Sequence, residues 1–205
     1  MAVPLDGPGS REAYALDAIV PKLRGVPTDP GFVVDGPRAA VAAILRELPR
    51  GAVELFFILR AEHPHDPWSG HVAFPGGRRD PEDESLLRTA IRETREEVGI
   101  ELAAEHLVGR LPDVSAFTRS KKGNLVVTPF VFALRSEVAV VPNDEVATTL
   151  WVPLTTLADR AGKSTFKLEY NHQTLDLPYI HLDPGQHRLW GLTYRMLETL
   201  LDAIR

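Results

Sequence analysis

Residues 76–99 read GGRRDPEDESLLRTAIRETREEVG, and this stretch decides the fold prediction. From about residue 84 to 98, apolar or small side chains recur at three- and four-residue spacing, at Leu87, Ala90, Ile91, Thr94 and Val98. This periodicity predicts an amphipathic helix whose apolar face packs against the rest of the protein. Asp80 supplies an N-cap acid, Pro81 suits the first helical position, and Gly99 supplies the C-terminal stop.

The other face of this helix carries three glutamates, Glu93, Glu96 and Glu97. Their spacing of three and four residues places the carboxylates within one turn, where like charges destabilise one another. A hard cation such as Mg²⁺ or Mn²⁺ relieves that repulsion and retains coordination positions for substrate phosphates. The alternative is a solvated helix face with Arg92–Glu96 pairs.

The surrounding pattern favours the cation. The residues Gly77, Glu84, Arg92, Glu93, Glu96, Glu97 and Gly99 stand in a fixed register that resembles the Nudix box, the loop–helix–loop of hydrolases that cleave nucleoside diphosphate derivatives. One departure is a spacer of six residues between Gly77 and Glu84, where the family pattern has five. The resemblance implies an α+β Nudix fold, with a mixed β-sheet sandwiched between helices (α/β/α).

Further residues resemble one branch of that family, the coenzyme A pyrophosphatases. They are Leu59-Arg60, Gly70, FPGGRRDPED at 74–83, VTPFV at 127–131 and WGLT at 190–193, whereas RAEHPH at 60–65 departs from the usual Arg-Ser start. The resemblance implies metal-dependent hydrolysis of coenzyme A, and of its esters, to 3′,5′-ADP and 4′-phosphopantetheine. Two alternatives stay open: a pyrophosphatase for ADP-ribose or another nucleoside diphosphate derivative, and a non-catalytic nucleotide-binding module.

The resemblance also assigns expected roles to residues. The cation ligands, for Mg²⁺ or Mn²⁺, are expected to be Gly77 (through its carbonyl), Glu93, Glu96 and Glu97. The general base is expected to be Glu96 or Glu145, the latter because family members often bring a downstream acid from a loop. Arg92 is expected to orient the carboxylates through charge-assisted hydrogen bonds.

Cationic side chains are the candidates for phosphate binding, although each also fits a surface charge. The candidates are Arg60, Arg78, Arg79, Arg119 and Lys122, with Lys121 beside the last. Trp68, Trp151 and Trp190 could stack an adenine ring, but packing roles are favoured for them. A zinc site at His63, His65 and His71 is rejected because Pro64 and Pro67 leave no regular element to hold the rings.

The rest of the chain indicates a mixture of helices and strands. We expect a helix over residues 11–20 that follows Ser10 and ends at Pro21, and a hairpin of residues 39–48 and 53–59, although 39–48 also suits a helix. Further strands are expected at 107–111, 124–134 and 146–152, and a closing helix at 189–204. The predicted organisation is an N-terminal extension, residues 1–37, and one Nudix hydrolase domain, residues 38–205.

Composition excludes several classes of function. The chain has 205 residues, no cysteine and a formal net charge of −5, so a thiolate metal site is excluded and nucleic-acid binding is disfavoured. No export leader or membrane segment is recognised, which together with the missing cysteines favours the cytoplasm. The expected partner is a small-molecule substrate, and a homodimer is compatible with the pattern.

Overall fold

The computed structural model describes residues 13–26, 36–49, 51–64, 68–116, 125–162, 164–170, 173–183 and 187–205. Its centre is a mixed eight-stranded sheet with strand order β3-β2-β1-β7-β5, in which β4 also pairs with β1, β6 with β7 and β8 with β2. The strands are β1 (Arg38–Glu47), β2 (Val53–Arg60), β3 (Val72–Ala73), β4 (Gly76–Arg78), β5 (Leu107–Arg110), β6 (Val114–Ala116), β7 (Leu125–Leu134) and β8 (Val146–Pro153).

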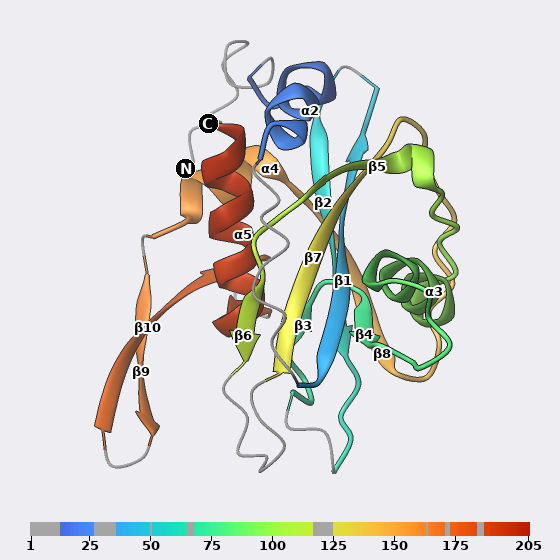
Figure 1. The fold of residues 1–205 in the computed structure, drawn as a ribbon. Helices are drawn as coiled ribbons and strands as arrows, with labels where there is room; N and C mark the ends of the chain where they lie inside the picture. The colour runs from blue at the N-terminus through green and yellow to red at the C-terminus, as the bar shows by residue number, and fades with distance from the viewer. Residues whose placement is uncertain are drawn as a thin grey trace.

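Helices cover both faces of this sheet (Figure 1). Helix α3 (Leu86–Val98) lies on one face, and α2 (Leu16–Arg24) and α5 (Gly191–Ile204) lie on the other. A fourth helix, α4 (Leu154–Arg160), follows β8, and a 3₁₀ turn, η1 (Ala104–His106), precedes β5. The expected α/β/α arrangement is therefore confirmed.

Strand β1 explains why residues 39–48 were ambiguous from the sequence. Its side chains alternate between two cores: Ala39, Val41, Ala43 and Leu45 pack on the α5 side, and Ala40, Ala42 and Ile44 on the α3 side. Because both faces are buried, the strand shows a continuous apolar run instead of an alternating one. The hairpin with β2 is confirmed, with Leu45 opposite Leu55, and β1 also pairs in parallel with β7.

Two helix boundaries differ from the prediction. Helix α2 continues through Pro21 to Arg24, because Leu16, Ile19 and Leu23 are all buried in the core on either side of the proline. The burial of these side chains outweighs the hydrogen bond that the proline removes. The expected start of this helix, up to residue 12, lies outside the described residues.

Helix α3 begins later than predicted, with Ser85 as its N-cap; the Ser85 side chain accepts a hydrogen bond from the Arg88 N–H at 3.3 Å. Asp80 instead accepts the Glu82 N–H in a separate turn, and the Asp80 N–H donates to the Asp83 carboxylate. The predicted stop is confirmed, since Gly99 closes α3 in the left-handed conformation with φ 68°.

A smaller three-stranded sheet was missed from the sequence. It consists of β9 (Thr165–Tyr170), β10 (Gln173–His181) and β11 (Arg188–Trp190), and the β9–β10 ribbon projects away from the main sheet (Figure 1). Leu189 and Trp190 belong to β11, so the closing helix starts at Gly191 and not at residue 189. In the described part of the chain, no helix is both long enough and apolar enough to cross a bilayer.

Candidate active site

Gly76 connects the sheet to the glutamate-bearing helix. Its φ is +146°, and a Cβ atom there would lie 2.3 Å from the Ala40 carbonyl oxygen, so only glycine fits between β4 and β1. This close approach places the Gly76 N–H 2.8 Å from Oε2 of Glu97. The glycine thereby donates to a carboxylate that is only 3% exposed.

Gly77 makes room for a second glutamate. A Cβ atom at this position would lie 2.5 Å from the carboxylate carbon of Glu93. Gly77 lies opposite Ala40 in the pairing of β4 with β1, so the sheet fixes its backbone against α3. The Gly77 backbone and the Glu93 carboxylate are therefore direct neighbours, as a shared ligand set would require.

The three helix glutamates differ in exposure, which the sequence did not predict. The side chain of Glu97 is 4% exposed, that of Glu93 19% and that of Glu96 49%. Glu97 therefore lies on the packed side of α3, between the helix and β4, and Glu96 lies at the solvent edge. Glu84, the first glutamate of the pattern, is exposed and lies 3.9 Å from Arg88 Nε.

Burial and neighbouring charge raise the pKa of two of these carboxyls. Burial raises the pKa of Glu97 to about 7, an effect that the Gly76 N–H and Arg60 oppose and that Glu93 and Glu145 reinforce. Burial also raises the pKa of Glu93, against the lowering effect of Arg92. Burial, reinforced by neighbouring carboxylates, thus disfavours the charged form of both groups in the free protein.

Glu145 reaches this site because its loop docks on the end of α3. The N–H groups of Val141 and Asn143 donate to the Val98 and Glu97 carbonyls at 2.8 and 2.9 Å, which satisfies carbonyls that a helix end leaves free. The Glu145 carbonyl accepts the Ala61 N–H at 2.8 Å. The Glu145 carboxylate is close enough to raise the pKa of both Glu93 and Glu97.

Arg92 joins the loop before α3 to the glutamates. Its Nε and Nη2 donate to the two oxygens of Asp83 at 3.1 and 2.9 Å, and its Nη1 lies 3.0 Å from Glu93 and 2.9 Å from Glu96. Asp83 is buried and also accepts hydrogen bonds from Thr89 Oγ1 and from the Asp80 N–H. The hydrogen bonds from Arg92 hold the pKa of Asp83 well below its usual range. From the sequence, Asp83 was interpreted only as a second acid near the start of the helix, and its pairing with Arg92 was not predicted.

The candidate phosphate-binding cations lie in different places. Arg60 Nη1 lies 3.6 Å from Oε1 of Glu97, inside the carboxylate cluster. Arg79 donates its Nε and Nη2 to the Asp83 carbonyl, so it braces the loop, and Arg78 is exposed on β4 opposite Ala39. Arg119, Lys121 and Lys122 lie outside the described residues.

The donor set suits a hard divalent cation. Among the described residues, no three histidine or carboxylate side chains already form a complete metal-ligand set. Glu93 and Glu96 instead face Arg92, while Glu97 faces Gly76 and Arg60. Carboxylate oxygens, a neighbouring backbone and raised carboxyl pKa values are the features that Mg²⁺ or Mn²⁺ would satisfy.

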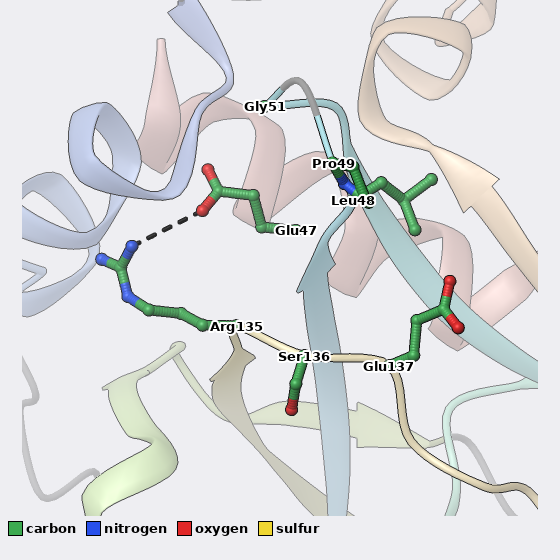
Figure 2. A pocket seen from close by; sticks show the side chains of 7 residues that line it. All are labelled: Glu47, Leu48, Pro49, Gly51, Arg135, Ser136 and Glu137. Carbon is green, nitrogen blue, oxygen red and sulfur yellow. Dashed lines mark hydrogen bonds and ion pairs between the residues drawn. The ribbon is translucent and has the colours of Figure 1, made fainter.

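An open pocket elsewhere on the molecule lacks these features. It is lined by Glu47, Leu48, Pro49, Gly51, Arg135, Ser136 and Glu137, and Figure 2 shows Arg135 reaching toward Glu47 across it. Arg135 pairs with Glu47 at 3.5 Å and also with Asp17, so the arginine that lines this pocket is already paired with carboxylates. It lies where β1 ends, whereas Gly77 pairs near the start of that strand.

Comparison with known proteins identifies the family. The family model described as NUDIX domain matches residues 36–170, which include β4, α3 and the 141–145 loop. The chain belongs to the Nudix family. As a Nudix hydrolase it is a pyrophosphohydrolase, and the matched residues include Gly77, Arg92 and the three glutamates of α3.

Its relatives are Nudix proteins of similar length. The chain is 34% identical over 172 residues to the mitochondrial coenzyme A diphosphatase NUDT8 of Mus musculus, covering 82% of this chain and 79% of the mouse protein. The human protein of the same name is 33% identical over 171 residues, covering 82% of this chain and 70% of that protein. The Nudix hydrolase NudL of Yersinia pestis is 31% identical over 184 residues, covering 84% and 82% of the two chains.

A solved structure supports the fold. A MutT/nudix family protein from Enterococcus faecalis aligns with a TM-score of 0.56 at 18% sequence identity. The alignment covers 81% of this chain and 61% of the enterococcal chain. At this identity the likeness concerns the Nudix fold alone.

Proposed function

We propose that this Nudix hydrolase cleaves the diphosphate of coenzyme A, and of its esters, to give 3′,5′-ADP and 4′-phosphopantetheine. The observation that carries the substrate class is the similarity to two proteins named coenzyme A diphosphatases across about four fifths of this chain. The FPGG stretch at 74–77, Arg60 and the WGLT stretch at 190–193 support the same branch.

The reaction is the addition of water across the bridging P–O bond. The water oxygen attacks one phosphorus, the bond to the bridging oxygen breaks, and each half leaves as a phosphate monoester. A divalent cation, Mg²⁺ or Mn²⁺, supplies charge neutralisation for the diphosphate and activates the attacking water. Glu93, Glu96, Glu97 and the Gly77 carbonyl would hold it.

The chain's own residues position the reactants. Arg92 holds Glu93 and Glu96 from one side, and it is fixed by two hydrogen bonds to Asp83. Arg60, beside Glu97, is the cation placed to contact a substrate phosphate. Glu145 is the proposed proton acceptor, because its loop is docked on the end of α3 and its carboxylate is near enough to raise the pKa of Glu93 and Glu97; Glu96 is the alternative.

A substrate panel tests the proposal. Purified protein with Mg²⁺ or Mn²⁺ is given coenzyme A, an acyl ester of it, 3′-dephospho-coenzyme A, ADP-ribose and a dinucleoside polyphosphate, and the products are identified by mass spectrometry. We expect the highest kcat/KM for coenzyme A or its ester, and at least about tenfold less for 3′-dephospho-coenzyme A, which is a loss of about 1.4 kcal/mol. A preference for ADP-ribose over all coenzyme A derivatives would replace the substrate assignment.

The cytoplasmic location and the division at residue 38 remain predictions. The two mammalian relatives are named as mitochondrial proteins, so fractionation of the source cells is the direct measurement of compartment. Helix α2 of the N-terminal extension packs on the same core as α5, and Lys22 Nζ donates to the Ile204 carbonyl at 2.8 Å. These contacts join the extension to the core of the Nudix domain.

A further inference from the structure

Three aromatic rings share one face of the small sheet. Tyr179 on β10 lies opposite Trp190 on β11, and Phe166 on β9 lies opposite Leu177, two residues from Tyr179 and therefore on the same face. The Phe166 ring is 5.3 Å from the Trp190 ring and 5.9 Å from the Tyr179 ring, centroid to centroid. All three side chains are half-buried, so part of each ring area stays accessible.

An exposed arginine lies over these rings. The guanidinium carbon of Arg188 is 5.0 Å from the Phe166 centroid and 4.7 Å from the Tyr179 centroid, within the range of cation–π attraction. Arg188 itself is exposed on β11. A guanidinium oriented by aromatic faces can still donate its N–H groups to a phosphate.

The aromatic face is continuous with the candidate active site. The His71 ring lies 4.8 Å from the Trp190 ring, and the His71 carbonyl accepts the Arg60 N–H at 3.0 Å. Arg60 in turn lies 3.6 Å from Glu97. His71 therefore lies between Arg60 and Trp190, and a ligand whose phosphates contact Arg60 would reach the aromatic face by extending past His71.

We propose that this aromatic face, made of His71, Phe166, Tyr179 and Trp190, stacks the purine ring of the substrate's nucleotide half, and that Arg188 contacts a phosphate on the ribose. The Phe166 ring meets the Trp190 ring at 90° and the Tyr179 ring at 74°, so a purine would stack on the face of one ring and contact the edge of another. The positive charge of Arg188 beside the rings matches a nucleoside whose ribose carries a phosphate. This inference rests on the proposed function, because it places the nucleotide half of that substrate.

The test compares two ligands that differ only in the base, AMP and ribose 5-phosphate. Their dissociation constants are measured by NMR titration with Mg²⁺, and saturation transfer to purine H2 and H8 reports contact with the base. We expect wild-type protein to bind AMP at least about tenfold more tightly, equivalent to about 1.4 kcal/mol. In Phe166→Leu and Tyr179→Leu, which keep apolar volume but remove a ring, we expect the ratio to fall below about threefold.

A matched control exists near Arg46, at the end of β1 that is far from Gly77. Trp151 packs against Phe56 in a tilted arrangement with a centroid distance of 4.6 Å, and the Arg46 guanidinium carbon lies 4.0 Å from the centroid of the Trp151 ring. This arrangement also combines two rings and an arginine, but Arg46 is near the end of β1, away from Gly77. Trp151→Leu is expected to keep the wild-type ratio for AMP over ribose 5-phosphate.

Arg188→Gln provides a second variant that leaves the rings intact. We expect it to weaken binding of adenosine 3′,5′-diphosphate about three- to tenfold and to leave AMP binding unchanged. Equal affinity of wild-type protein for AMP and ribose 5-phosphate overturns the proposal. A change in the molar mass of the protein on Phe166→Leu also overturns it, because a second copy would then cover this face. A loss of kcat/KM in this variant that is confined to long-chain acyl esters overturns it as well.

These outcomes are independent of the substrate panel. Coenzyme A, ADP-ribose and a diadenosine polyphosphate all contain an adenosine 5′-phosphate moiety. Coenzyme A adds a 3′-phosphate to it. If the panel shows ADP-ribose as the substrate, the coenzyme A assignment fails while a purine preference that depends on Phe166 still supports the stacking site. If coenzyme A is cleaved but the preference is missing, only the stacking site fails.

Discussion

Buried carboxylates at the two ends of α3 have pKa values shifted in opposite directions. Before the helix begins, Asp83 receives hydrogen bonds from Arg92, Thr89 and the Asp80 N–H, and its pKa is lowered. Near the helix end, Glu97 receives one N–H from Gly76, faces Arg60 at 3.6 Å and has its pKa raised to about 7. Asp83 is electrostatically satisfied by the protein alone, whereas Glu97 still requires positive charge.

This difference separates structural carboxylates from functional ones. A satisfied carboxylate stabilises the fold, and replacing it should cost stability. An unsatisfied one destabilises the free protein and is expected to bind a cation, so replacing it should cost activity. The following experiments test whether Asp83 and Glu97 divide in this way.

The largest effect is expected for Glu97→Gln. Removing the charge without changing the side-chain size should lower kcat by at least about a thousandfold, because a proposed cation ligand is lost while the packing is kept. Circular dichroism should show an unchanged fold, and Mg²⁺ should no longer raise Tm. Glu101→Gln, at an exposed position just beyond the helix, is the matched control. Turnover near wild type in Glu97→Gln would remove this residue from the ligand set.

Glu145→Gln should have the next largest effect. If Glu145 accepts the proton, kcat should fall about a hundredfold with little change in KM, as expected of an interaction made in the transition state. Steady-state kinetics on the preferred substrate give both constants. A change in KM alone, or no change, would assign the proton to Glu96.

Asp83→Asn should affect stability more than chemistry. The substitution breaks the paired hydrogen bonds to Arg92 in a buried position, which should lower the free energy of unfolding by about 3 kcal/mol in urea titrations. At saturating Mg²⁺ the loss in kcat should remain well below that of Glu97→Gln. A stability loss under about 0.5 kcal/mol would mean that Glu93 and Glu96 hold Arg92 without Asp83.

The last effect concerns the pH dependence of stability in the absence of metal. The pKa of Glu97 rises from 4.5 to about 7 on folding, so the unfolded chain loses this proton first and stability falls between about pH 4.5 and 7. We expect a loss of about 3 kcal/mol over this window in EDTA, since the pKa rises by about 2.5 and each pKa unit corresponds to about 1.4 kcal/mol. Mg²⁺ at pH 8 should restore it, and Glu97→Gln should flatten the profile.

Asp83 gives the opposite sign in a different window. Its pKa is lowered on folding from 3.8, so its contribution is complete above that value and is lost as the pH falls further. Acid unfolding below about pH 4 should therefore become less steep in Asp83→Asn. A variant profile identical to wild type in acid would contradict the ion pair with Arg92.

Local patterns predicted the parts of this molecule that depend on near neighbours. The helix at residues 86–98, its stop at Gly99 and the β1–β2 hairpin follow from periodicity and turn chemistry within a short stretch. The start of α3 was placed wrongly because the Asp80 side chain has a nearer backbone partner, the Glu82 N–H. An N-cap pattern alone does not show which backbone N–H group will donate a hydrogen bond to the Asp80 carboxylate.

Contacts between distant segments could not be predicted from those patterns. The Arg38–Asp113 ion pair at 2.8 Å, with Arg110 and Thr128 on the same carboxylate, joins three strands that no local signal relates. The docking of Val141 and Asn143 on the end of α3 is of the same kind. The burial of Glu97 could not be predicted either, because it depends on where β4 crosses the helix.

The parallel pairing of β1 with β7 has a consequence for the order of folding. The register joins Arg38 to Val126 and Arg46 to Leu134, so β2, β4 and α3 all lie within the chain loop that this pair closes. Closing so long a loop is entropically slow, and parallel strands cannot form through a hairpin. The hairpin of β1 with β2 and helix α3 can form early, but β7 must arrive before the sheet beneath the helix is complete. Metal affinity should therefore appear only in the last kinetic phase of refolding.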